Sequence, residues 1–84
     1  MTSMITQDSI ESAYCFFHQK WRVYAHSHSS VQKDDIEYAI ASYVEEMSRE
    51  LYEKLAEGKK DYLTDHSTFA DDMQSAIERL EKLM

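Results

Sequence analysis

Histidine is the residue type in this chain with the widest chemical use, because imidazole binds metal ions and exchanges protons near neutral pH. His26 and His28 lie two residues apart in a run of serines and histidines that ends at Ser30. This spacing suits a loop, and a third metal ligand would have to come from another segment, for example from His66. A His-dependent metal-binding protein that uses residues 26–30 is therefore one hypothesis. The same residues also suit a polar loop, and we predict no metal site and no cofactor.

Cys15 and His18 are three residues apart, a spacing that on a helix could form a thiolate–imidazole pair for nucleophilic catalysis. No third group that would orient the histidine accompanies them, and no oxyanion donor does. The glutamates between Glu45 and Glu57 could do acid–base chemistry only if burial separated their pKa values, and helical spacing places them on a solvated face. We therefore predict that the protein is not an enzyme and has no catalytic residues.

The net charge of −7 is spread unevenly along the 84 residues. Residues 1–30 carry two acidic and two basic side chains, residues 31–58 carry eight and three, and residues 59–84 carry six and four. A surface that is acidic as a whole repels nucleic-acid phosphates and anionic lipid. The first segment alone escapes this repulsion.

That first segment also holds the one basic cluster that contains an aromatic residue, formed by Lys20, Trp21 and Arg22. Interleaved basic and aromatic side chains are typical of nucleic-acid binding, so a small nucleic-acid-associated regulator is a further hypothesis. Two formal positive charges are few for this purpose, and the apolar spacing assigns Trp21 to the core. Nucleic acid is therefore not favoured as a partner.

The composition itself restricts the fold, because the chain has one glycine and no proline. Strand-rich folds and phosphate-binding loops need turn residues and glycines, so an all-α protein is favoured. No apolar run reaches the roughly 18 to 20 residues that cross a bilayer, and no membrane contact is predicted. Cys15 is the only cysteine, which excludes an intrachain disulfide and leads us to expect a cytoplasmic location.

Apolar periodicity predicts a first helix over about residues 7–25, with Thr6 as its N-cap or, alternatively, with Asp8 and Glu11 as a capping pair. Its apolar positions recur at alternating spacings of four and three, which places them on one helical face. These positions are Ile10, Tyr14, Phe17, Trp21 and Tyr24.

A second helix is predicted over about residues 31–57, capped by Ser29 or Ser30 and ended by Gly58 at the C′ position. Its core stripe is Ile36, Ile40, Tyr43, Val44, Met47, Leu51 and Leu55. This helix would be the longest of the fold, so part of it would protrude or pair with another chain.

A third helix is predicted over about residues 68–83, where the spacing from Thr68 to Asp71 resembles an acidic capping box. Its apolar stripe is Phe69, Met73, Ala76, Ile77, Leu80, Leu83 and Met84, and its solvent face includes Asp71, Asp72, Ser75, Glu78, Arg79 and Lys82. In the connection before it, Tyr62 and Leu63 are expected to turn inward, with room for a short extra helical turn near residues 60–65.

These elements predict a single domain over residues 1–84, folded as an antiparallel three-helix bundle with short connections. Apolar side chains in excess of its core are the most informative feature for function, because aromatic residues are favoured at protein interfaces. The candidate interface consists of Phe16, Val23, Tyr38, Ala41 and Tyr52. We therefore predict a non-enzymatic helical protein that acts through protein–protein contact, with a protein partner or as a homodimer.

Overall fold

The first helix begins where Thr6 caps it, as the sequence predicts. In the computed structural model, which describes residues 5–84, α1 spans Gln7–His26. The Thr6 hydroxyl accepts a hydrogen bond from the Ser9 amide at 3.1 Å, and the Ser9 hydroxyl accepts one from the Thr6 amide at 2.9 Å. This reciprocal pair satisfies two amide donors at the helix start, so the alternative pair of Asp8 and Glu11 is not used. Residues 1–4 of the predicted domain lie outside the described residues.

The prediction of one helix over residues 31–57 is wrong, because the chain forms two helices there. Ser29 caps α2 (Ser30–Glu46), the backbone turns extended at Met47, and the Ser48 hydroxyl then accepts a hydrogen bond from the Leu51 amide to start α3 (Arg49–Ala56). A serine side chain that bonds the backbone can compete with helix continuation. The break changes the direction of the chain, and Leu51 of α3 is buried in the core. A straight continuation of α2 would carry Leu51 beyond that core.

The end of α3 lies where Gly58 predicts it. Glu57 at the C-cap has φ of 51° and Gly58 at the C′ position has φ of 82°, so both residues are left-handed. Left-handed backbone also recurs at Asp61 and Leu63, whose φ values are 57° and 67°. A residue other than glycine is strained in this conformation, so contacts with the rest of the protein must stabilise the backbone of the connection after α3.

Gly58→Ala is expected to lower the free energy of unfolding by about 1 kcal/mol, because alanine pays a steric penalty at positive φ. A β-carbon at Gly58 would meet no atom within 4 Å, so the whole effect comes from the backbone. Urea unfolding followed by circular dichroism measures it. Lys60→Ala in the same exposed connection is the control and should change little. A Gly58→Ala protein more stable than its parent would contradict the left-handed assignment.

The C-terminal segment forms a short 3-10 helix, η1 (His66–Thr68), that continues into α4 (Phe69–Leu83). The predicted bounds of the third helix are confirmed to within a residue, whereas the extra helical turn lies after, not within, residues 60–65. The predicted capping box is wrong. Thr68 makes no side-chain cap, and its hydroxyl instead donates to the carboxylate of Asp72 at 3.2 Å.

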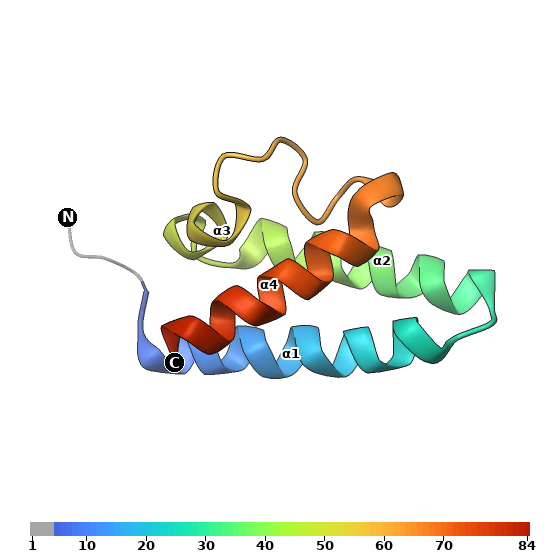
Figure 1. The fold of residues 1–84 in the computed structure, drawn as a ribbon, viewed down its shortest axis with the longest axis horizontal. Coiled ribbons are helices and arrows are strands. Elements are labelled where there is room, and N and C mark those ends of the chain that lie inside the picture. The colour runs from blue at the N-terminus through green and yellow to red at the C-terminus, as the bar shows by residue number, and fades with distance from the viewer. Residues whose placement is uncertain (1–4) are drawn as a thin grey trace.

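The described residues contain four α-helices, so the fold is all-α but is not the three-helix bundle predicted. Figure 1 shows α1 and α2 antiparallel and side by side, with α4 crossing over one face of this pair and α3 closing one end. The shortest dimension is 19 Å, which corresponds to two layers of helices. The α1–α2 layer is therefore covered by α4 on one face only.

The hydrophobic core lies between these layers and draws on every helix. The predicted inward turn of Tyr62 and Leu63 is confirmed, since both side chains are buried. Leu83 and Met84, which the stripe of the last helix places in the core, are exposed at its end. No helix among the described residues is long and apolar enough to cross a membrane. The buried core residues are Ile10, Ala13, Phe17, Ile36, Ile40, Leu51, Leu55, Ala56, Tyr62, Leu63, Phe69, Met73, Ala76, Ile77 and Leu80.

Candidate functional site

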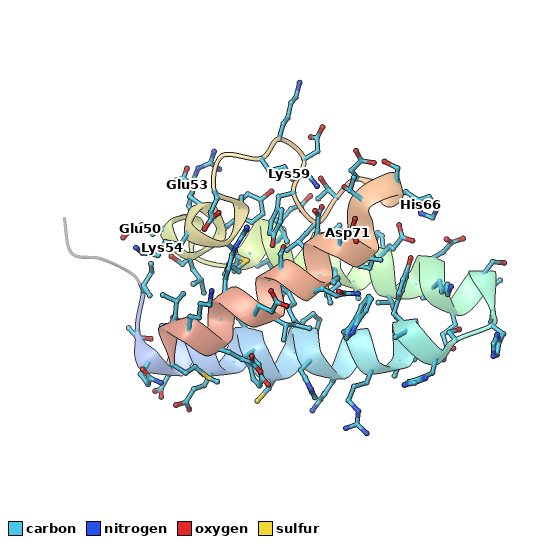
Figure 2. All side chains as sticks on the ribbon, in the orientation of Figure 1. Glu50, Glu53, Lys54, Lys59, His66 and Asp71 are labelled. Atoms are coloured by element: carbon cyan, nitrogen blue, oxygen red, sulfur yellow. The ribbon has the colours of Figure 1, made fainter. Side chains whose placement is uncertain are left out.

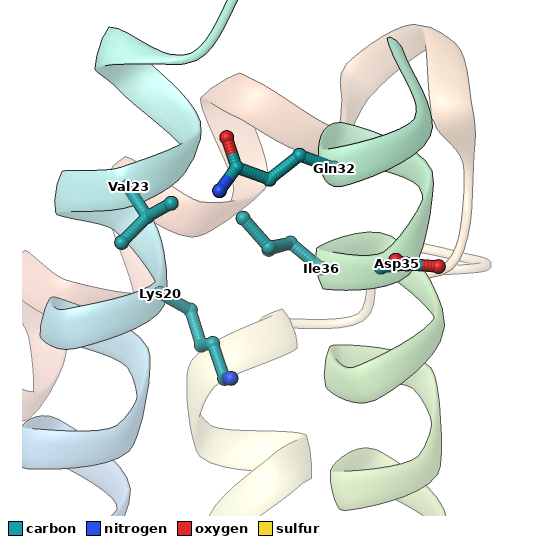
Figure 3. Close-up of a pocket in the computed structure, with 5 residues that line it drawn as sticks. All are labelled: Lys20, Val23, Gln32, Asp35 and Ile36. Carbon is teal, nitrogen blue, oxygen red and sulfur yellow. The ribbon is translucent and has the colours of Figure 1, made fainter. Parts of the chain in front are cut away.

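The uncovered face of the α1–α2 layer carries the most exposed apolar side chains of the two helices. The seam between them holds a hollow of about 240 Å³, where Val23 of α1 points towards Gln32 and Ile36 of α2 (Figure 3). Lys20 and Asp35 border the hollow on opposite sides. We call this surface the open face, and it consists of Phe16, Lys20 and Val23 from α1 and of Val31, Asp35, Ile36 and Tyr38 from α2.

Helical geometry explains why Val31 and Tyr38 belong to the open face. They precede and follow Asp35 by about one helical turn, so the three side chains share one stripe of α2. Tyr38 is 75% exposed, Val31 is 68% exposed, and Val23 across the seam is 45% exposed. Val23 lines the hollow, and Val31 and Tyr38 flank Asp35 at its α2 side, so exposed apolar side chains lie on both helices.

The structure brings only part of the predicted interface together. Val23 and Tyr38 lie on the open face, and Phe16 joins them half-buried, with its ring stacked on that of Tyr43 at a centroid distance of 4.4 Å. Ala41 is half-buried on α2. Tyr52 lies on α3, where its hydroxyl donates to the carbonyl oxygen of Tyr62 at 2.7 Å, so this side chain already supports the connection after α3.

Charge is divided across the open face. The α1 side carries Lys20, whose ammonium lies 5.5 Å from the ring centroid of Phe16. The exposed Arg22, two residues further on, lies on the opposite side of the helix. The α2 side carries the exposed Asp34 and Asp35. Among residues 5–84, no ion pair connects these two groups across the seam. The hollow is therefore bordered by a basic side chain on α1 and by an acidic side chain on α2.

The remaining acidic side chains lie away from this seam. Figure 2 shows Glu50, Glu53 and Lys54 around α3, at the end of the molecule opposite the turn between α1 and α2. The glutamates from Glu45 to Glu57 are all exposed, as predicted. Arg49 pairs with Glu53 at 3.5 Å on the same helix, an exposed arrangement that contributes little to stability.

The candidate catalytic and nucleic-acid groups of α1 are used in packing or lie in solvent. Cys15 is exposed, and the ring of His18 stacks on Tyr14 at 5.4 Å. Trp21 is half-buried, and its ring stacks on Tyr24 at 6.0 Å. The structure therefore assigns the indole to the aromatic packing of α1.

The histidines named for the metal hypothesis are not part of a common ligand set. His26 and His28 are exposed at the turn between α1 and α2, whereas His66 of η1 lies 2.9 Å from the carboxylate of Glu37 on α2. Glu37 also accepts a hydrogen bond from the Tyr24 hydroxyl at 3.2 Å. Residues 5–84 contain no group of three histidine, cysteine or carboxylate side chains that could hold a metal ion.

The contact between His66 and Glu37 predicts a pH dependence of stability. The hydrogen bond and charge of Glu37, with smaller contributions from Asp34 and Asp65, raise the pKa of His66 above its ordinary value of 6.5. The charged histidine is thus favoured in the folded state, and its contribution is present below pH 6.5 and lost as the pH rises through the folded pKa. The effect is small because the imidazole is exposed.

A His66→Gln variant measures this contribution by comparison with the parent protein. The difference in urea midpoint between the two proteins should be larger at pH 5.5 than at pH 8.5, on either side of the ordinary histidine pKa. His28→Gln, at an exposed histidine without a carboxylate contact in the structure, is the matched control and should show no such change. A difference that grows with pH would contradict the predicted sign.

Sequence reasoning missed the one charged side chain that is buried among the described residues. Asp72 was predicted on the solvent face of the last helix, but it is only 2% exposed. Its carboxylate pairs with the ammonium of Lys59 and accepts hydrogen bonds from the Leu63 amide at 2.9 Å and from the Thr68 hydroxyl. We call these four residues the Asp72 cluster. A buried carboxylate needs such partners, and here they fix residues 59–68 onto α4.

Two further contacts hold the same connection in place. The Tyr62 hydroxyl donates to the backbone carbonyl of Asp72 at 2.9 Å, and burial raises the pKa of this phenol. Arg79 donates to the carbonyl of Leu55 at the end of α3 and pairs with Glu57 at 3.1 Å. No buried side-chain nitrogen or oxygen of residues 5–84 lacks a hydrogen-bond partner. The Asp72 cluster is thus internally satisfied, as expected of a structural element.

No family model, curated protein or solved structure matches this chain. Its function therefore has to be inferred from its own surfaces, of which the open face carries the most exposed apolar side chains, Val31 and Tyr38. The Asp72 cluster, in contrast, has its polar groups paired within the chain.

Proposed function

We propose that this protein has no catalytic activity and acts by binding another protein through the open face. The observation that carries the proposal is the uncovered side of the α1–α2 layer, where Val23 and Ile36 line a hollow. Val31 and Tyr38, on the same stripe of α2 as the bordering Asp35, are 68% and 75% exposed. Tyrosine is enriched in the cores of protein interfaces. A partner that covers this side would bury these side chains and complete the layer as α4 does on the other side.

The charge distribution supports the same surface. The protein carries a net charge of −7, which opposes contact with most acidic proteins, but the hollow is bordered by one basic and one acidic side chain, Lys20 and Asp35. This local balance reduces the repulsion beside the exposed apolar side chains of the open face. Charged residues at the rim of an interface remain solvated while the apolar centre is buried.

Site-specific photo-crosslinking in the native cell tests the proposal. A benzophenone side chain in place of Tyr38 should crosslink to a discrete protein product that mass spectrometry identifies. The same side chain in place of Ala70, which is exposed on α4, is the matched control and should give no such product.

Val23→Glu should suppress the product formed from position 38, because a carboxylate in the seam would be buried by the partner. Val23 is 45% exposed in the isolated chain, so the variant should keep its helices, and circular dichroism checks this. The proposal is contradicted if position 38 gives no product, or if positions 38 and 70 give the same ones.

A further inference from the structure

We infer that the open face binds a second copy of this chain, with the twofold axis running parallel to α1 and α2. This inference rests on the proposed function and names its partner. In the resulting dimer, α1 of each copy packs against α2 of the other. Two two-helix layers then meet face to face, and each copy keeps its own α4 on the outside (Figure 1). Isologous pairs of this kind are the commonest protein oligomers.

The division of charge on the open face selects this axis. Lys20 borders the seam on α1, and Asp35 borders the same hollow on α2 (Figure 3). An axis parallel to the helices brings the basic side of one copy over the acidic side of the other, twice per dimer. An axis lying across the helices would place α1 on α1 and α2 on α2, so that like charges would meet.

The apolar groups fit the same arrangement. Val23 and Val31 lie on opposite sides of the seam and are both substantially exposed. Val23 of each copy can therefore contact Val31 of the other. The hollow above Ile36 gives such a side chain a place to insert. Apolar contact supplies the affinity, and the paired charges set the register and the direction of the axis.

The same charges disfavour other kinds of partner. Nucleic acid would place its phosphates against Asp35, and a strongly basic protein would meet Lys20. A second copy presents both signs in the complementary order.

Charge exchange combined with sedimentation tests the inference. The purified chain should sediment as a dimer at micromolar concentration and dissociate on dilution. Lys20→Glu and Asp35→Lys should each weaken association by about tenfold or more, because each places like charges opposite one another. The double variant, which restores opposite charges with their positions exchanged, should recover most of the lost affinity. Glu78→Lys on the exposed side of α4 is the control and should leave association unchanged.

The outcomes separate this inference from the proposed function. A parent protein that remains monomeric at high micromolar concentration overturns the second copy as partner. Single variants that dissociate without recovery in the double variant, while circular dichroism shows them folded, overturn the parallel axis. In either case a crosslinked product from position 38 that is a different protein would leave the proposed function standing. The absence of any product would remove both.

Discussion

Phe17→Ala is expected to lower the free energy of unfolding by about 3 to 5 kcal/mol, the largest effect of any substitution considered for this protein. The Phe17 side chain is completely buried, and its ring meets Tyr43 edge-on at 5.4 Å and Phe16 at 6.1 Å. Alanine would remove the ring and leave a cavity that these aromatic neighbours can fill only in part. Small domains are stable by only about 5 to 15 kcal/mol, so the variant should be close to its folding limit.

Urea unfolding followed by circular dichroism measures this loss. Phe17→Leu retains most of the side-chain volume and provides a value even if the alanine variant does not fold, with an expected loss of about 1 to 2 kcal/mol. Val23→Ala on the open face is the matched control and should change stability by no more than about 0.5 kcal/mol in the monomer. Equal unfolding midpoints for Phe17→Ala and the parent would show that the core is assigned incorrectly.

Asp72→Ala should cost about 2 to 4 kcal/mol, which is more than almost any other polar substitution in this chain. The change removes the acceptor of the Leu63 amide and leaves the ammonium of Lys59 without its carboxylate. The Lys59 side chain is 41% exposed and can regain water, so the loss falls below that of a fully buried ion pair. The Leu63 amide is buried and cannot replace the lost hydrogen bond with one to water.

The neighbouring Asp71→Ala is a stringent control for this variant, because Asp71 is one residue away on the same helix but exposed. Its stability should stay within about 0.5 kcal/mol of the parent. Hydrogen exchange adds a local measurement, since the Leu63 amide should lose protection in Asp72→Ala and keep it in Asp71→Ala. An Asp72→Ala protein as stable as the parent would mean that the cluster does not hold the connection in solution.

The parts of the fold that local chemistry determines could be predicted from the sequence. Thr6, Ser29 and Gly58 mark helix ends because a side-chain oxygen or a left-handed backbone acts on its own few neighbours. The break at Met47 and Ser48 could not be predicted in the same way. Apolar spacing continues unchanged from Val44 to Leu51 across it, and only packing of α3 on the core favours the serine cap over a continuous helix.

The candidate sites likewise depend on tertiary contacts that local sequence patterns do not determine. Asp72 lies beside the apolar stripe of α4, and its burial depends on Lys59 and Leu63, whose placement requires a left-handed backbone without glycine. Tyr38 and Tyr52 look equivalent on one long helix. The break in that helix leaves Tyr38 on the open face and turns Tyr52 towards Tyr62. An interface predicted from helical spacing is therefore correct only for residues that lie on one continuous helix.

The packing of α1 has a consequence for how the protein reaches this fold. Its most extensive partner is α4 rather than α2, and the Tyr14 hydroxyl bonds Glu81 at a separation of 67 residues. Closing so long a stretch of chain costs entropy that a hairpin of neighbouring helices avoids. During synthesis, α4 can cover the apolar side of α1 only after α4 itself has been made. Until then, α2 and α3, which precede α4 in the chain, are the helices that can shield Phe17 from water.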